Sequence, residues 1–415
     1  MSPTQRTALA VGALAVSALA LPWTVVALGL AALVGALAAD LFAVRSPPAV
    51  RRSLPRTAAR GVPAAVALDQ IVPVPGSVRL RQPVPPDVEL EPSEADARLE
   101  GVLVARRRGR HELKEPVARR TGPLGLGRRD FAVLERTELH VYPDLPAASR
   151  IADSVRRGRF RETGHRTRGS LGLGTEFESI REYQPDDDIR QVNWAASERV
   201  GRPMSNQYRV EQDRDVICAL DSGRLMGSPL ASGTRLDIAV DAVAAVAAVA
   251  DELGDRCGLV AFDAEIRRHV RPSRRAARDV VAALFDLEPT RVDSDYELAF
   301  RRLGVSKRAF VLVLTDLLEP SAARSLIDAI PILARRHHVV VAGTADPDLD
   351  RLMSAEPVSA LAVYRTVVAT EVLAARERAA VALRAAGATV VEASPDRLGH
   401  ACVQAYLRAK ARARL

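Results

Sequence analysis

The stretch Val216-Ile-Cys-Ala-Leu-Asp221 decides the fold, because it is an uninterrupted apolar run that ends on a carboxylate. A strand covered by helices on both faces has this pattern, since neither of its faces can be polar. A second run, Arg308–Asp316, also ends on an aspartate. Open parallel sheets bind their ligands just beyond the carboxyl ends of the strands. We therefore expect Asp221 and Asp316 to lie at the same edge of one sheet.

Strand and helix patterns alternate regularly from Asp215 to the end of the chain. The expected strands are Val216–Asp221, Gly258–Asp263, Arg308–Asp316, His338–Thr344 and Thr389–Ala393, with Glu265–Arg271 as an antiparallel edge piece. The expected helices are Arg235–Asp255, Arg274–Leu287, Tyr296–Leu303, Ala322–Arg336, Glu371–Ala386 and Leu398–Leu415. This alternation predicts an α/β domain over residues 215–415, with a parallel sheet and helices on both of its faces.

The N-terminal segment Thr7–Val44 is almost wholly apolar and is interrupted at Pro22-Trp23. As a helix, Thr24–Val44 would be about 31 Å long, enough to cross the apolar part of a bilayer. Thr7–Leu21 would be about 22 Å long. It is either the first arm of a transmembrane helical hairpin over residues 1–46 or a signal peptide, since Ala18-Leu19-Ala20 resembles a cleavage site. The hairpin is the preferred interpretation.

Basic residues without acidic ones follow the second apolar segment. They are Arg45, Arg51, Arg52, Arg56 and Arg60. Such an excess marks the cytoplasmic side of a membrane span. We therefore expect a protein of the plasma membrane whose soluble domains face the cytoplasm.

Residues 60–143 differ from the rest of the chain. Proline is frequent, and short pieces such as Val78/Leu80, Val88/Leu90 and Leu139/Val141 alternate with polar residues. This pattern predicts a small β-rich, sandwich-like domain of antiparallel strands. Residues 145–214 form a further segment, discussed below.

Composition excludes several classes of protein. The three cysteines are far apart and form no Cys-x-x-Cys pair, so neither a zinc site nor a disulfide framework is indicated. Cys218 and Cys257 lie in apolar runs and are expected to be core residues. The chain contains no P-loop, no Gly-x-Ser-x-Gly and no His-Glu-x-x-His motif. The formal charge of +8 is interpreted as a solvated basic surface near a membrane.

The segment Gly174–Pro185 is followed by a turn at Pro185–Asp188 that we expect to lead into a helix, with Ile189 and Val192 facing inward beside Trp194. Arg181, Arg190 and Arg199 are close enough in sequence to pair with Glu176, Glu178 and the aspartates. An ion-paired loop and helix packed on the next domain is the expected structure.

This segment resembles the bacterial domain-of-unknown-function family fifty-eight (DUF58). The resemblance rests on Glu176, Arg181, Tyr183, Asp187, Arg190, Trp194, Ala196-Ser197 and Arg199, and on the strand ending in Leu-Asp. Three positions, in two short stretches, depart from the family pattern. Asp186-Asp187 replaces Gly-Asp, and Asn193-Trp194-Ala195 replaces Asp-Trp-Lys.

The resemblance implies a von Willebrand factor A-like α/β domain, which often carries a metal-ion-dependent adhesion site. Asp221 matches the first ligand of that site and Asp316 the last, while Ser294 would stand in for its threonine. Gly223 and Leu225 occupy the two serine positions. The resemblance thus implies a degenerate site, for which Mg²⁺ is the candidate ion.

Three functions remain open from the sequence. The first is a non-catalytic, membrane-anchored interaction protein, and family resemblance implies a MoxR-type AAA ATPase as its partner. The second is a divalent-metal-dependent hydrolase using Asp221, Asp316 and Asp263. The third is a binder of anionic lipid or nucleic acid through Arg106–Arg110 and the basic tail at Arg408, Lys410, Arg412 and Arg414. No specific nucleic acid is expected, because neither cluster contains aromatic residues.

Overall fold

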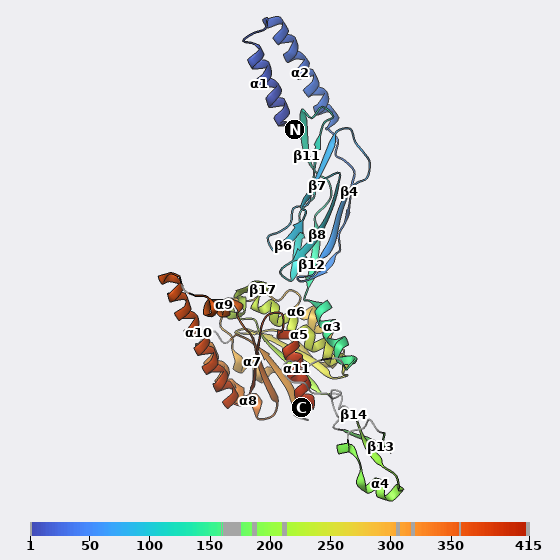
Figure 1. Ribbon diagram of the computed structural model, residues 1–415, viewed down its shortest axis with the longest axis vertical. Helices are drawn as coiled ribbons and strands as arrows, with labels where there is room; N and C mark the ends of the chain where they lie inside the picture. Colours follow the sequence, from blue (N-terminus) through green and yellow to red (C-terminus); the bar gives the residue numbers. More distant parts are fainter. Residues whose placement is uncertain are drawn as a thin grey trace. The chain divides into compact units, whose positions relative to one another are not determined.

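The computed structural model describes residues 2–158, 160, 176–184, 189–209, 214–303, 308–316, 320–356 and 358–411 of the 415-residue chain. The chain forms two compact units, Met1–Tyr142 and Pro143–Leu415 (Figure 1). The predicted anchor, residues 1–46, falls in the first unit together with the β-rich region. The predicted segments 145–214 and 215–415 fall in the second.

The first unit begins with two helices, α1 (Gln5–Ser17) and α2 (Trp23–Ala43), which lie side by side (Figure 1). Among the described residues, α2 is the one helix long and apolar enough to cross a membrane, with 21 residues and a mean hydropathy of 2.3. Helix α1 has 13 residues and is shorter than a span. The turn between the helices contains Pro22, close to the predicted interruption.

The rest of the first unit is β-rich. A five-stranded sheet has the order β1-β11-β10-β5-β7, a four-stranded sheet β2-β4-β8-β6 and a three-stranded sheet β3-β12-β9. The strands are β1 (Ser2–Pro3), β2 (Val50–Ser53), β3 (Thr57–Ala59), β4 (Ala64–Gln70), β5 (Ser77–Arg81), β6 (Val88–Glu91), β7 (Glu94–Asp96), β8 (Arg98–Ala105), β9 (Gly109–Leu113), β10 (Val117–Thr121), β11 (Gly127–Ala132) and β12 (Thr137–Tyr142). All described pairings are antiparallel except β3 with β12. The alternating apolar residues point inward as predicted, since Leu80, Leu90 and Leu139 are buried.

The second unit contains a mostly parallel sheet of the order β19-β18-β15-β20-β21-β22. Its strands are β15 (Asp215–Asp221), β18 (Arg256–Phe262), β19 (Ile266–Arg274), β20 (Ala309–Leu314), β21 (His338–Thr344) and β22 (Thr389–Ala393). Only β19 is antiparallel to its neighbour. The chain leaves β15 toward β18 on one side and later returns to β20 on the other. The carboxyl ends of β15 and β20 therefore flank the switch point at which such sheets place their ligands.

Helices cover both faces of this sheet (Figure 1). The helices are α3 (Leu145–Arg156), α5 (Arg235–Glu252), α6 (Ala277–Leu284), α7 (Tyr296–Arg302), α8 (Pro320–Ala334), α9 (Pro347–Ser354), α10 (Ala360–Ala385) and α11 (Leu398–Ala411). Helices α7, α8 and α10 pack on one face around Val311, Val313 and Val341. Helix α5 lies on the other, with α3, α6 and α11 packed against it. Cys218 and Cys257 are buried free thiols, as predicted.

A hairpin of β13 (Glu176–Glu182) and β14 (Met204–Arg209) carries α4 (Trp194–Val200) between its strands. A short 3₁₀ turn, η1 (Ile189–Gln191), precedes α4. A second such turn, η2 (Arg224–Gly227), follows β15, and a small ribbon of β16 (Pro229–Leu230) and β17 (Gly233–Thr234) leads into α5.

The strands match the prediction more closely than the helices do. His338–Thr344 and Thr389–Ala393 have the predicted bounds, and the antiparallel edge strand is confirmed. Helix α10, however, begins at Ala360, eleven residues before the predicted start at Glu371. Its first turns have no buried apolar stripe, because Leu361, Val363 and Tyr364 are exposed. Hydrophobic periodicity therefore did not indicate that these turns are helical.

Candidate functional site

Asp221 ends β15 and is buried, with 2% of its surface exposed. Its Oδ1 accepts hydrogen bonds from the Gly223 amide at 2.8 Å and from Ser294 Oγ at 2.5 Å. Its Oδ2 accepts from Tyr296 Oη at 2.9 Å and from Thr315 Oγ1 at 2.7 Å. A carboxylate offers about four lone-pair sites, so these four donors saturate Asp221.

The three hydroxyl groups reach Asp221 from fixed positions in the fold. Tyr296 is the first residue of α7, where the Asp295 side chain caps the helix by accepting from the Leu298 amide at 2.9 Å. Thr315 directly follows β20, the neighbour of β15 in the sheet. Burial, and secondarily the charge of Asp221, raises the pKa of the Tyr296 phenol well above its usual value. Tyr296 therefore stays a neutral donor to the carboxylate.

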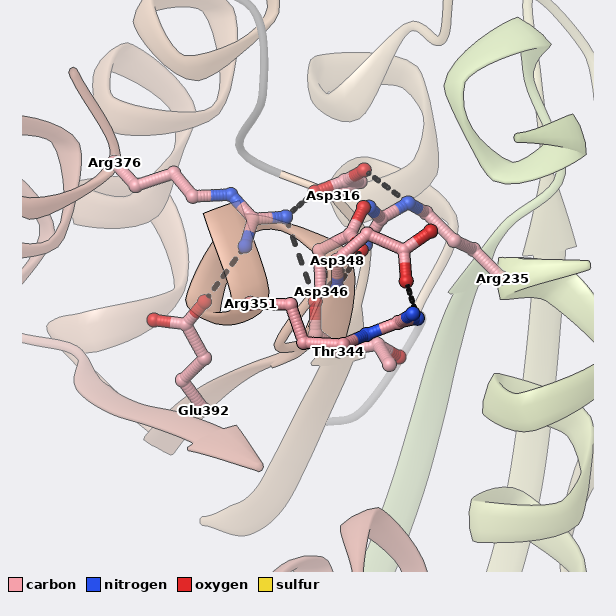
Figure 2. Close-up of polar contacts among 8 residues, drawn as sticks. All are labelled: Arg235, Asp316, Thr344, Asp346, Asp348, Arg351, Arg376 and Glu392. Carbon is pink, nitrogen blue, oxygen red and sulfur yellow. Dashed lines mark hydrogen bonds and ion pairs between the residues drawn. The ribbon is translucent and has the colours of Figure 1, made fainter. Parts of the chain in front are cut away.

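Asp316, the other strand-end acid, lies between two buried arginines (Figure 2). Its Oδ1 accepts from Arg376 Nη2 at 3.0 Å, and its Oδ2 lies 2.8 Å from Arg235 Nε. The latter two atoms do not meet the geometry of a hydrogen bond, so that contact is mainly coulombic. The exposed fractions of the three side chains are 3% for Asp316, 2% for Arg235 and 6% for Arg376.

Further partners complete the arginine network (Figure 2). Arg235 donates to the Thr344 carbonyl oxygen and to Asp346 Oδ2, both at 2.9 Å. Arg376 donates to Glu392 Oε1 at 2.9 Å. Two guanidinium groups thus face three carboxylates, of which Asp346 and Glu392 reach solvent. We call Arg235, Asp316, Asp346, Arg376 and Glu392 the arginine network.

The local sequence explains how the two arginines reach Asp316. Arg235 is the first residue of α5, whose start is fixed by a capping box between Thr234 and Asp237. Arg376 lies on the buried face of α10, seven residues after Ala369 and seven before Leu383. Burial lowers the pKa of the Arg235 guanidinium from its usual value, and the charge of Asp316 opposes that shift. A lone buried charge would be costly, so the arginines and Asp316 depend on each other.

This arrangement does not fit a bound Mg²⁺. A magnesium ion requires a nearly octahedral set of oxygen ligands. The oxygens of Asp221 are saturated by protein donors, and those of Asp316 face two cations. At Gly223, a Cβ atom would lie 2.3 Å from Ser294 Oγ, so a serine ligand has no room there. Within the described part of the chain, no three histidine, cysteine or acidic side chains are grouped for a metal.

The structure thus brings Asp221 and Ser294 together but gives Asp316 separate partners. Arg224, three residues after Asp221, forms an ion pair with Asp293 at 2.5 Å. Asp263, the third acid of the hydrolase hypothesis, is also buried, and it accepts from the Glu265 amide at 2.8 Å. Sequence reasoning missed Arg235 and Arg376. For Arg376 the sequence did contain a signal, because this charged residue lies on the apolar face of a helix.

The hairpin of β13, β14 and α4 holds the residues that carry the family resemblance. Asn193 Oδ1 caps α4 by accepting from the Ala196 backbone amide at 2.9 Å. The Nδ2 group of the same side chain donates to Asn206 Oδ1 on β14 at 2.9 Å. Ser197 Oγ accepts from the Met204 amide at 2.8 Å. Asn193 therefore keeps the capping function that an aspartate would have at this position. These contacts fix α4 against β14.

The expected inward packing of Ile189 beside Trp194 is wrong. Ile189 is 69% exposed and Trp194 is 72% exposed. Trp194 is the first residue of a short helix after a 3₁₀ turn, so the segment lacks the continuous helix that would have turned both side chains inward. Within the described residues of the hairpin, Arg202 forms an ion pair with Glu182 at 3.4 Å.

Several predicted partners cannot be placed. Asp187 lies outside the described residues, as do the side chains of Glu176, Glu178 and Arg190. Of the other signature residues, Arg181 donates to the Glu182 carbonyl oxygen at 3.1 Å, and the Tyr183 amide donates to the Pro203 carbonyl oxygen at 2.9 Å. Arg199 is an exposed residue in the last turn of α4. The ion pairs expected within the signature remain a prediction.

Both basic clusters of the anionic-ligand hypothesis have acidic partners. Arg106 makes two hydrogen bonds to Glu89, at 2.7 and 2.8 Å. Lys410 is buried and pairs with Asp255, which also accepts from the Tyr406 hydroxyl. Lys410 therefore belongs to the core packing of α11. Arg412 and Arg414 lie outside the described residues.

A family profile described as "Protein of unknown function DUF58" matches residues 179–358, from the hairpin to the loop before α10. The chain belongs to the DUF58 family. The uncharacterized proteins Rv1480 of Mycobacterium tuberculosis and Mb1516 of Mycobacterium bovis are both 27% identical to it over 182 residues. That alignment covers 42% of this chain and 56% of each relative, so it spans little more than half of their length.

Two solved structures show weak likeness to this DUF58 protein. An uncharacterized membrane-spanning protein from Vibrio fischeri has 18% identity and a TM-score of 0.16, covering 32% of this chain and 71% of that one. A trypsin-activated alpha-2-macroglobulin from Escherichia coli has 12% identity and a TM-score of 0.17, covering 82% and 24%. At these TM-scores neither likeness bears on the fold.

Proposed function

We propose that this DUF58 protein is a non-catalytic adaptor of the plasma membrane that docks a protein partner in the cytoplasm. In this proposal α1 and α2 form the anchor as a transmembrane hairpin. The α/β unit has a von Willebrand factor A-like fold and presents the docking surface. The six-stranded sheet with its antiparallel edge strand and two helix layers supports that fold assignment.

The exposed apolar surface of the hairpin carries the proposal. Trp194 and Ile189 are more than two-thirds exposed, and Val200 is 52% exposed. Large exposed side chains of this kind on a soluble unit mark interaction sites, and tryptophan is enriched among the residues that dominate binding energy. These residues lie within the part of the chain that matches the DUF58 profile. We call Ile189, Trp194 and Val200 the hairpin patch.

The chemistry of the strand ends supports docking over hydrolysis. The three acids of the hydrolase hypothesis, Asp221, Asp263 and Asp316, are buried and bound by protein donors. Their role in the proposal is to hold the loops at the sheet edge in place. No observation in the described residues favours hydrolysis or anionic-ligand binding by the clusters considered from the sequence.

The proposed partner is a MoxR-type AAA ATPase, acting with the adaptor in chaperone-like assembly. Membership of the DUF58 family supports this choice, because that partner is the one the family resemblance implies. The chain has no P-loop of its own. Any ATP-driven step would therefore depend on the partner.

Co-purification from native membranes tests the proposal. Full-length wild type, extracted in mild detergent with and without nucleotide, should recover the ATPase. The double variant Ile189→Ser/Trp194→Ala should recover less than about a tenth as much, since truncating one dominant aromatic contact costs roughly 2 kcal/mol or more. Expression level and thermal midpoint are measured for every sample.

Leu361→Ser/Tyr364→Ala is the matched control. Leu361 is 58% exposed and Tyr364 is 66% exposed, but both lie on α10 beyond the matched range. This variant should recover as much ATPase as wild type. Loss of the ATPase with the control but not with the hairpin variant would move the docking surface to α10. Failure to recover any ATPase with wild type would contradict the proposal.

A further inference from the structure

A polar pocket of about 700 Å³ lies at the base of the two N-terminal helices. It is formed by the start of α1, the start of β5 and the β10–β11 turn. None of the residues that line it is acidic, and its polar side chains are those of Thr4, Gln5, Arg6, Ser77, Thr121 and Arg128. Thr4 Oγ1 donates to the Gly125 carbonyl oxygen at 2.6 Å. The pocket therefore offers two guanidinium groups and the hydroxyl groups of Ser77 and Thr121 to a ligand.

The glycine at position 125 leaves room for the Arg6 side chain. At Gly125, a Cβ atom would lie 2.9 Å from Arg6 Nη1, and φ is +72°, a conformation that side chains other than glycine rarely adopt. Arg128 is held by Ser2, since its Nε donates to Ser2 Oγ at 3.2 Å. Both arginines are exposed. Paired guanidinium groups with nearby hydroxyl groups suit a phosphate, whose oxygens accept several hydrogen bonds at once.

The pocket is fixed to the end of α2 by a buried carboxylate. Asp40 accepts from the backbone amides of Leu124, Leu126 and Gly127 at 2.9, 2.7 and 2.8 Å. On the α1 side, Thr7 Oγ1 donates to the Leu126 carbonyl oxygen at 2.6 Å. The turn that lines the pocket is thus tied to both helices.

The surroundings of the pocket change from apolar to basic over a short distance. On the helices, Leu9, Val16 and Leu28 are 74%, 69% and 72% exposed. At the base of α2, the guanidinium of Arg45 lies 4.1 Å from the centre of the Phe42 ring, and Arg129 donates to the Arg45 carbonyl oxygen at 3.1 Å. Basic residues next to apolar helices are typical of the level at which lipid headgroups lie.

We infer that this pocket binds the phosphate headgroup of an anionic phospholipid, with its acyl chains along α1 and α2. The inference rests on the proposed membrane anchoring and gives it a lipid preference. A lipid is favoured over a free phosphate because the exposed apolar helix surface begins where the pocket ends. Arg6 and Arg128 are the residues that contact the phosphate.

Lipid retention by the full-length chain tests the inference. The protein is reconstituted in nanodiscs of phosphatidylcholine containing a minority of phosphatidylglycerol, and the lipids retained after detergent extraction are identified by native mass spectrometry. Wild type should retain phosphatidylglycerol in preference to phosphatidylcholine. Arg6→Gln/Arg128→Gln should reduce that retention roughly tenfold, since each arginine near an anionic lipid contributes to its attraction.

Arg81→Gln/Arg136→Gln is the matched control, because it removes the same charge from two exposed arginines of the same unit that lie outside the pocket and outside the Arg106–Arg110 cluster. It should leave lipid retention unchanged. Inorganic phosphate and glycerol 3-phosphate, added as competitors, should not displace the lipid. Displacement by either would overturn the lipid assignment, as would equal loss of retention in the pocket variant and the control.

The outcome also separates this inference from the anchoring proposal. A wild-type chain that does not enter nanodiscs contradicts the anchor itself. A chain that enters nanodiscs but shows no preference between the two lipids contradicts only the headgroup site.

Discussion

At the residue scale, Asp221 shows how a buried carboxylate is held without a positive charge. Its four donors are three hydroxyl groups and one backbone amide. Hydrogen bonds to a charged group stabilise a fold by roughly 1.5–3 kcal/mol each. The sequence placed Asp221 at a strand end through its apolar run, and its family resemblance indicated Ser294 as a stand-in for a threonine ligand. It gave no sign of Tyr296 or Thr315, whose hydroxyl groups converge only when α7 and β20 pack against β15.

Replacing Tyr296 tests this network. Tyr296→Phe removes the hydroxyl group that donates to Asp221 and contacts Thr315 at 2.8 Å. We expect the free energy of unfolding to fall by about 2 kcal/mol, measured by urea denaturation of the full chain in detergent and followed by circular dichroism. Tyr364→Phe is the control, because Tyr364 is 66% exposed. Equal losses in the two variants would contradict the account.

The same tyrosine predicts a dependence on alkaline pH. Because its folded pKa is raised above the unfolded value of about 10, the folded state keeps a proton that the unfolded state loses. The resulting stability is complete below pH of about 10 and is lost as pH rises toward the folded pKa. The difference in unfolding free energy between wild type and Tyr296→Phe should therefore shrink above that pH. A difference that stays constant or grows would be inconsistent with the raised pKa.

At the element scale, strands were easier to predict than helices. The strands β15, β20 and β21 are buried on both faces, so their apolar runs set their bounds. The first turns of α10 and the segment around Trp194 expose their apolar side chains, and there hydrophobic periodicity gives a wrong or missing element. The arginine network could not be predicted either. It joins residues from α5, α10, β22 and the loops after β20 and β21, which are far apart in the sequence.

The arginine network predicts that the stability of the fold depends strongly on the ion pair between Asp316 and Arg376 of α10. Arg376→Gln leaves Asp316 with one buried cationic partner, and Asp316→Asn leaves two arginines facing a neutral group. Each change should lower the free energy of unfolding by about 3–5 kcal/mol. The double variant should cost less than the sum of the two, because the residues contact each other.

Arg384→Gln on the same helix is the control for this cycle. Arg384 is exposed and pairs with Glu377 at 3.2 Å, so its loss should cost no more than about 0.5 kcal/mol. Additive effects of Arg376→Gln and Asp316→Asn in urea denaturation would show that the network is not coupled.

At the scale of the whole molecule, apolar surface is exposed in two distinct settings. In the first unit it covers α2, whose length and composition suit a bilayer. In the second it occurs at the hairpin patch, which suits a protein surface, and along the first turns of α10, where Leu361, Val363 and Tyr364 are exposed. The acids that could have formed a catalytic centre are bound within the protein instead. The proposed membrane anchor and docking surface would account for these two settings.

Titration calorimetry of the detergent-extracted full chain with Mg²⁺ and Mn²⁺ tests this account most directly. The saturated Asp221 and the arginine-bound Asp316 predict no saturable heat with either ion, and the same thermal midpoint with magnesium as with a chelator. A saturable heat that Asp221→Asn abolishes would contradict the account and restore a metal centre at the sheet edge.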